Sequence, residues 1–184
     1  MSVFTNPASG SVENAKAYTA AVLGLLGSRD PIAVLSETPI RLHSTLEGLS
    51  DAQISMPEAP NKWSIRQVLA HLADSELVWG WRLRLILTQD RPVITGYDQD
   101  AWADRLGYSE VDVRYSTDTF RLLRQGNLRL VSSASPQDLD RFGVHAERGE
   151  ESVRHLIGLY AGHDILHLNQ LDRIRRAVAG RASA

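Results

Sequence analysis

The stretch NKWSIRQVLAHLADSE, residues 61–76, carries the clearest structural signal in the chain. Ser64 can cap a helix, and the side chain of Gln67, three residues later, can bind back to the Ser64 amide, which together form a capping box. Apolar residues then recur at helical spacing for about 24 residues, until Pro92 and Gly96 interrupt the pattern. The sequence therefore predicts a long helix that begins at Ser64.

Apolar residues at helical spacing predict further helices on both sides of this one. On the N-terminal side, one helix is expected over 11–26, and a second over 30–49, where Asp can cap the helix and Pro suits its first turn. On the C-terminal side, long helices are expected over about 110–134 and 152–178, with a short one at 98–106 inside a long connection. No stretch predicts a strand with comparable strength.

The composition bounds the domain organisation. A chain of 184 residues that is 43% hydrophobic is long enough for one domain with a sizeable core and short for two. Its predicted helices favour an all-α fold, namely an antiparallel four-helix bundle with an additional N-terminal helix and a long connection between bundle helices 2 and 3. We expect this single domain to span residues 11–184, and residues 1–10, which lack periodicity, to form a loosely ordered N-terminus.

Charge and residue content exclude several classes of function. A net charge of -2 gives no electrostatic footprint for nucleic acid or an anionic membrane surface, so neither is expected as a partner. The N-terminus does not resemble a signal peptide, and no apolar run approaches the roughly 20 residues that span a bilayer, which predicts a cytoplasmic protein. Because the chain has no cysteine, any metal must be bound by imidazole, carboxylate, carbonyl or water, and any thiol must arrive with a substrate.

The predicted last helix has a core-facing seam that contains two histidines. The seam alternates spacings of four and three residues. It comprises Leu156, Tyr160, His163, His167, Gln170 and Ile174. The two histidines are one turn apart, with Cβ atoms about 5–6 Å from each other, which is close enough to share one metal ion. Six histidines in 184 residues give such a pair by chance often enough that a third ligand is needed.

His71 is the candidate third ligand, because it lies early in the long helix, inside the apolar sequence VLAHLA. A lone histidine in this setting is more often a satisfied core residue than a ligand. Three histidines from two facing helices reverse that preference, because burying several imidazoles without partners is costly. The sequence therefore favours one divalent metal ion bound by His71, His163 and His167.

Three segments resemble the DinB-like superfamily: KWSIRQVLAHLADSE at 62–76, GYDQDAWA at 96–103 and GHDILHLNQLDRI at 162–174. They look most like its branch of proposed metal-dependent hydrolases that includes the bacillithiol S-transferases, and the resemblance covers most of the chain. It implies a four-helix bundle in which one histidine of the second bundle helix and two of the last helix bind a divalent ion, commonly nickel or zinc. Those ligands fall on His71, His163 and His167. The family includes dimers, so the resemblance is also compatible with a homodimer.

A three-histidine site has consequences for the chemistry. Three neutral imidazoles leave a divalent ion its full charge and at least one open position, as in catalytic rather than structural sites. Such an ion can bring a bound water to a pKa of about 7 or hold a thiol as the nucleophilic thiolate. We therefore expect an enzyme with a small-molecule substrate, either a transferase that adds a low-molecular-weight thiol to an electrophile or a hydrolase. The alternative is a non-catalytic, stress-related binding protein with a structural metal.

Several residues near the histidines are candidates for supporting roles. Asp74 and Asp164 are the carboxylates closest to the histidines in sequence; Asp74 is the candidate catalytic proton acceptor, although both can instead orient imidazoles. Tyr160 and Gln170 share the seam of the last helix and could line a pocket, but core packing explains them equally well. Trp102 lies in the long connection that could cover the metal.

Overall fold

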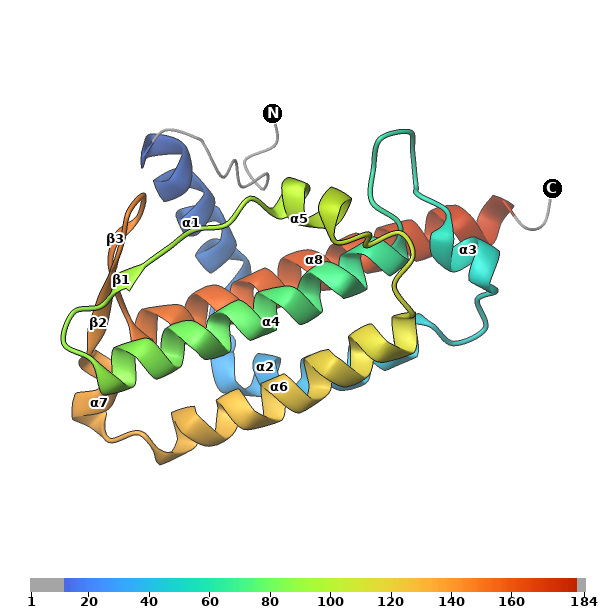
Figure 1. The fold of residues 1–184 in the computed structure, drawn as a ribbon. Helices are drawn as coiled ribbons and strands as arrows, with labels where there is room; N and C mark the ends of the chain where they lie inside the picture. The colour runs from blue at the N-terminus through green and yellow to red at the C-terminus, as the bar shows by residue number, and fades with distance from the viewer. Residues whose placement is uncertain (1–11, 182–184) are drawn as a thin grey trace.

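The computed structural model describes residues 12–181 (Figure 1), so the predicted loosely ordered N-terminus at residues 1–10 lies outside the described residues. Helices make up most of this range, and short strands lie near one end. In chain order the elements are α1 (Val12–Leu26), α2 (Pro31–Thr45), α3 (Asp51–Ser55), α4 (Ile65–Thr88), β1 (Val93–Ile94), α5 (Gln99–Arg105), α6 (Val113–Ser133), α7 (Pro136–Asp140), β2 (Phe142–His145), β3 (Gly149–Ser152) and α8 (Val153–Arg181). None of the described helices is long and apolar enough to cross a bilayer.

Helices α2, α4, α6 and α8 form the predicted four-helix bundle. Each of them packs against two others, α2 and α4 both lying beside α6 and α8. Helix α1 is the predicted additional helix, and it packs against α8 on the outside of the bundle (Figure 1). The expected fold class, with its long connection between α4 and α6, is therefore confirmed.

The directions of the helices follow from that long connection. It returns along the whole of α4, because the Tyr108 hydroxyl donates a hydrogen bond to Asp74 and Arg66 donates one to the carbonyl oxygen of Val111, both in the first half of α4. Helix α6 thus starts beside the start of α4, and these two helices run in the same direction (Figure 1). Helices α2 and α8 are also parallel to each other, and they run in the opposite direction to α4 and α6. The antiparallel arrangement expected for the whole bundle holds for the pairs α4–α8 and α2–α6 only.

Helix α4 begins where the sequence predicts. The Ser64 side chain accepts a hydrogen bond from the Gln67 amide, and the Gln67 side chain accepts one from the Ser64 amide at 3.0 Å, which completes the capping box. Helix α8 is placed against α1 by a close backbone approach at Gly162. A Cβ atom at this position would collide with the carbonyl oxygen of Val22, so only glycine allows this crossing next to His163.

A small three-stranded sheet, which the sequence did not predict, closes one end of the bundle. Strand β1 is parallel to β2, with Val93 opposite Val144, and β2 is antiparallel to β3, with His145 opposite Gly149. These strands have two to four residues each, which is too short to show an alternating pattern. The sheet ties the α4–α6 connection to the turn before α8, and both segments contribute side chains to the site described below.

Two apolar clusters fill the bundle, and a buried polar layer separates them. One cluster contains Trp79 and Leu156, and the other contains Leu72 and Leu171. The layer consists of buried polar residues on α4, α6 and α8, near the positions at which the residues of one cluster give way to those of the other: His71, Ser75, Glu76, Arg124, Asn127, Asp164 and His167. Buried polar groups need partners. The partners in this layer therefore show what the middle of the bundle is built to hold.

Candidate metal centre

Three histidine side chains converge in the polar layer from two helices. His71 projects from α4, and His163 and His167 project from consecutive turns of α8. The Nε2 atom of His163 lies 3.3 Å from that of His71 and 3.1 Å from that of His167. Ligands about 2.1 Å from a tetrahedral ion are roughly 3.4 Å apart. These two spacings match that geometry, and the ligand atoms of all three histidines lie within 4.8 Å of one another, so the three could share a single divalent ion.

Burial keeps the three rings neutral. Desolvation lowers the pKa of His71 and of His163 well below the usual value, and it lowers that of His167 to about 4. Neutral imidazole is the form that binds metal ions. In His167 the proton sits on Nδ1, which donates a hydrogen bond of 2.8 Å to Oε1 of Gln170. The Nε2 atom of His167 consequently presents a bare lone pair to the other two rings.

The hydrogen-bonding capacity of the cluster also fits a cation. A neutral imidazole has one ring proton, so the Nε2 atom of His163 can donate to only one of its two neighbours. A divalent ion satisfies all three nitrogens at once. Among residues 12–181, these three histidines form the one group of candidate ligands close enough together to hold an ion. The structure thus brings together the ligand set that the sequence proposed, and its occupancy by a metal stays a prediction.

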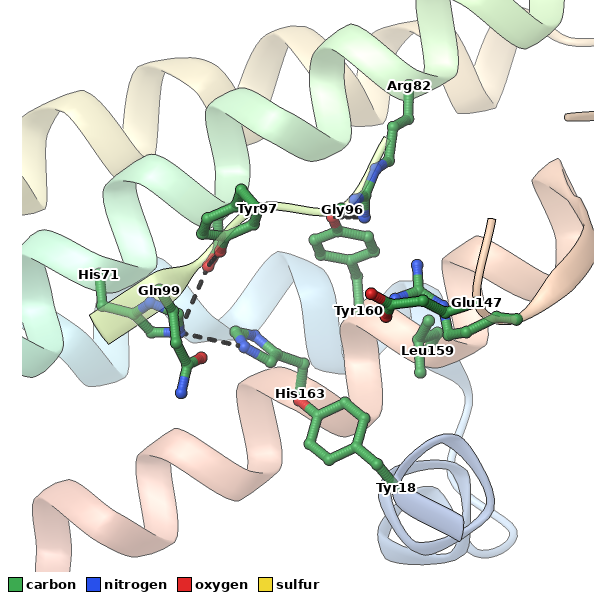
Figure 2. A pocket seen from close by; sticks show the side chains of 12 residues that line it. Tyr18, His71, Arg82, Gly96, Tyr97, Gln99, Glu147, Leu159, Tyr160 and His163 are labelled. Atoms are coloured by element: carbon green, nitrogen blue, oxygen red, sulfur yellow. Dashed lines mark hydrogen bonds between the residues drawn. The ribbon is translucent and has the colours of Figure 1, made fainter. Parts of the chain in front are cut away.

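The cluster is open on one side. A cavity of about 60 Å³ begins at His71 and His163, which is room for a few water molecules (Figure 2). His163 is only half-buried, and no carboxylate or fourth histidine of the described residues completes a closed four-ligand site. A purely structural metal predicts such a closed site. The geometry therefore favours a site at which a molecule from outside can bind.

Two hydroxyl groups line the cavity beside His71. The Oγ atom of Ser75 lies 3.4 Å from Nε2 of His71 and 2.9 Å from the hydroxyl of Tyr97. Burial raises the pKa of Tyr97, so its phenol stays protonated and can donate a hydrogen bond. Trp102 packs against the Tyr97 ring, with centroids 4.5 Å apart. Trp102 thus supports the residue that covers the cavity.

The candidate supporting residues take different positions from those that sequence proximity indicated. Asp74 is three residues after His71, which turns it about 60° to one side on the helix, and it accepts a hydrogen bond from Tyr108. It does not line the cavity, so its role as proton acceptor stays a prediction without a supporting contact. Asp164 pairs with Arg124 at 2.6 Å instead of contacting an imidazole.

The two polar residues of the α8 seam both contact the site. Gln170 orients His167 through the hydrogen bond described above. Tyr160 lines the cavity beside His163, with ring centroids 6.1 Å apart, and stacks on Trp79 at 5.0 Å. Its hydroxyl accepts a hydrogen bond from Arg82. Both residues are therefore part of the surroundings of the candidate metal centre.

Sequence reasoning missed most of the cavity wall. Arg82 lies eleven residues after His71, which is about three helical turns. Helical periodicity could therefore have placed Arg82 on the same face of α4 as His71. Tyr97 follows β1, and Glu147 and Arg148 lie in the turn between β2 and β3. These three residues reach the cavity because the small sheet places them there. No periodicity in the sequence indicated that sheet.

A helical bundle with an open cluster of three neutral histidines is an arrangement that could hold a metal ion with a free coordination position. The chain belongs to the DinB superfamily, whose family model matches residues 35–171. This confirms the family that the three sequence segments resemble.

Similar proteins carry names that point to metal-dependent chemistry. A protein of Oceanobacillus iheyensis named "putative metal-dependent hydrolase" is 33% identical over 134 residues, which cover 73% of this chain and 77% of that protein. YfiT of Bacillus subtilis is also named a "putative metal-dependent hydrolase", and it is 31% identical over 146 residues, which cover 77% of this chain and 82% of YfiT. The solved structure of YfiT matches with a TM-score of 0.71 and 30% identity over 78% of this chain and 84% of that chain. It is described as a "probable metal-dependent hydrolase with an unusual four-helix bundle topology".

Proposed function

We propose that this protein is a metal-dependent transferase that joins a small thiol to an electrophilic carbon of a second substrate. His71, His163 and His167 would hold one divalent ion, nickel or zinc, both of which accept imidazole ligands. When bound, the ion supplies Lewis acidity that lowers the pKa of a water or thiol in the open position. The thiol comes from outside, because the chain has no cysteine.

The observation that carries the thiol proposal is the kind of group beside the histidines. Ser75 and Tyr97 are hydroxyl groups, and burial raises the pKa of Tyr97, so neither is a base. Making a nucleophile from water is helped by a base such as a carboxylate. A thiol has an ordinary pKa of about 8.5 and needs far less help to lose its proton. The one carboxylate that lines the cavity, Glu147, lies beside Gly96 and has no described contact with the three histidines of the cluster. The groups beside the histidines therefore suit a thiol better than a water.

The reaction balances without a further reactant. The sulfur–carbon bond forms as the bond from that carbon to its leaving group breaks, and the leaving group departs with the bonding electron pair. The proton lost by the thiol passes to the leaving group or, where the leaving group is a weak base such as chloride, to the solvent. The Tyr97 hydroxyl can stabilise negative charge that develops in the cavity by donating a hydrogen bond, while Trp102 holds its ring in place.

Hydrolysis is the second candidate, and the names of the relatives favour it. Both reactions use the same open site, so they differ in whether water or thiol is consumed. A non-catalytic binding protein is the third reading, and the absence of a fourth protein ligand among the described residues argues against it. We also propose that the protein forms a homodimer and is located in the cytoplasm.

The test compares thiol consumption by metal-loaded wild type, His163→Ala and the control His43→Ala, which removes an exposed histidine of α2. We expect wild type and His43→Ala to accelerate the loss of 2-mercaptoethanol in the presence of monochlorobimane, and His163→Ala to give the uncatalysed rate. Equal rates for all three proteins, with several thiols, would overturn the transferase. If His163→Ala instead abolishes hydrolysis of p-nitrophenyl esters only, the hydrolase replaces it.

A further inference from the structure

Arg82 is a buried cation without an acidic partner. Its side chain is 5% exposed. It donates hydrogen bonds to the Tyr160 hydroxyl at 3.2 Å and to the Thr95 carbonyl oxygen at 2.8 Å, both neutral groups. Its Nε–H has no partner among the described residues. No described carboxylate forms an ion pair with Arg82; Glu151 feels the charge of Arg82 from a distance but is paired with Arg148 at 2.6 Å.

The other buried arginines of the described chain show what is missing. Arg124 pairs with Glu76 at 2.8 Å and with Asp164 at 2.6 Å, and Arg66 pairs with Asp51. A buried charge without a counter-charge is costly, and native structures pair it. Arg82 departs from this pattern, and it lines the cavity that begins at His71 and His163. A negatively charged group that enters the cavity would supply the missing partner.

A second orphan donor lies near this end of the cavity. The Nδ1 atom of His145 accepts a hydrogen bond from the Glu147 amide, so the ring proton sits on Nε2. This Nε2–H is buried and has no partner among the described residues. It lies directly behind Gly96, at 3.7 Å from where a Cβ of that residue would be, and Gly96 lines the cavity. One unpartnered donor, Nε of Arg82, thus belongs to a residue of the cavity wall, and a second, Nε2 of His145, lies behind the wall at Gly96.

The position of Arg82 relates it to the candidate metal centre. Tyr160 lies between them: its hydroxyl contacts Arg82, and its ring centroid is 6.1 Å from that of His163. Figure 2 shows His71 and His163 at one end of the cavity, with Arg82 and Tyr160 toward the other. The half-buried carboxylate of Glu147 also lines the wall, while Arg148 is neutralised by Glu151 at 2.6 Å.

We propose that Arg82 binds a carboxylate group of the substrate whose reacting atom lies at the three histidines. This inference rests on the proposed function, in which the substrate is a thiol. The thiol would then be a small mercapto acid. The guanidinium plane matches a carboxylate, with Nε–H still free to donate. The carboxylate would anchor the far end of the molecule and fix the distance from sulfur to Arg82.

The experiment measures binding, without turnover, to cobalt-loaded protein. Mercapto acids with two to six carbons are each compared with the corresponding primary amide by isothermal titration calorimetry. The variants are Arg82→Gln and the control Arg84→Gln, which lies on the same helix but is exposed and bonds to Asn127. The sulfur-to-cobalt charge-transfer absorption is recorded in parallel, and the cobalt content of each variant checks that it folds.

We expect wild type and Arg84→Gln to bind the acid of the best length about tenfold or more tightly than its amide, because one charged hydrogen-bonded contact is at stake. Arg82→Gln should bind the two within about threefold of each other. Equal binding of acid and amide by wild type at every length, or a preference that survives in Arg82→Gln, would overturn the inference.

Absence of the sulfur-to-cobalt band with every thiol would count against the thiol transferase, whereas the calorimetric comparison would still decide the role of Arg82. If Arg82→Gln fails to fold, Arg82→Lys, which keeps the charge and loses the planar fork, should show a reduced preference.

Discussion

Oε1 of Gln170 lies 2.8 Å from Nδ1 of His167, one turn earlier on α8. The amide oxygen accepts the Nδ1–H of the ring, which fixes the tautomer and turns the Nε2 lone pair toward His163. A residue that the sequence analysis could explain equally well by core packing is therefore in contact with a candidate metal ligand.

Replacing Gln170 by Ala should weaken metal binding about 10- to 100-fold, because His167 loses the group that orients it. Asn169→Ala, which changes the exposed neighbouring amide, should leave the affinity unchanged. Competition with a chromophoric chelator measures both affinities. Equal dissociation constants for Gln170→Ala and wild type would show that the contact does not prepare His167 for a ligand.

Arg124 holds two buried carboxylates together at the centre of the bundle. It bonds to Asp164, next to His163, and to Glu76, whose pKa is raised by burial. Arg124→Met should lower the free energy of unfolding by about 3–5 kcal/mol, because both acids lose their partner. Arg121→Met, which breaks an exposed pair with Asp118, should change it by less than about 0.5 kcal/mol. Urea unfolding of the two variants gives the comparison, and similar midpoints would contradict it.

The backbone approach between α1 and α8 predicts opposite effects for two glycines. Gly162→Ala should destabilise the protein by about 1–3 kcal/mol, because the new Cβ would collide with the Val22 carbonyl oxygen. Gly126→Ala, in α6 with nothing near its would-be Cβ, should stabilise it by about 0.5–1 kcal/mol through helix propensity. Thermal unfolding should therefore move in opposite directions. A shift of the same sign in both variants would refute the close approach at Gly162.

The stability of the metal-free protein should depend on pH. Burial lowers the pKa of His71 well below the ordinary value of about 6.5. Below pH 6.5, His71 is therefore protonated in the unfolded chain but stays neutral in the folded chain. This contribution is fully present above pH 6.5 and is lost as the pH falls below it, at up to about 1.4 kcal/mol per pH unit. Urea midpoints should thus fall between pH 7 and pH 5, and fall less in His71→Asn. The same slope in both proteins would contradict a buried neutral His71.

The long helices could be predicted from the sequence because their signals are local. The capping box at Ser64 and Gln67 fixed the start of α4, and the alternating seam of α8 put His163 and His167 on one face. The third ligand was a weaker inference, since no local pattern shows that His71 faces α8. The family resemblance supported it, and the structure brings the three rings together.

The cavity wall could not be predicted in the same way, because it depends on contacts between distant segments. Tyr97 and Arg148 reach the cavity only through the pairing of β1 with β2 and of β2 with β3. Nearness in sequence did not indicate which groups the two carboxylates contact. Asp74 faces Tyr108 and Asp164 faces Arg124, although each lies within three residues of a histidine of the cluster.

Metal content tests the central claim most directly. Protein prepared without a polyhistidine tag, loaded with nickel or zinc and then desalted, should contain close to one ion per chain by inductively coupled plasma mass spectrometry. The triple variant with Ala at His71, His163 and His167 should contain none, while His43→Ala should match wild type. One ion per chain retained by the triple variant, or none retained by folded wild type, would contradict the three-histidine metal centre.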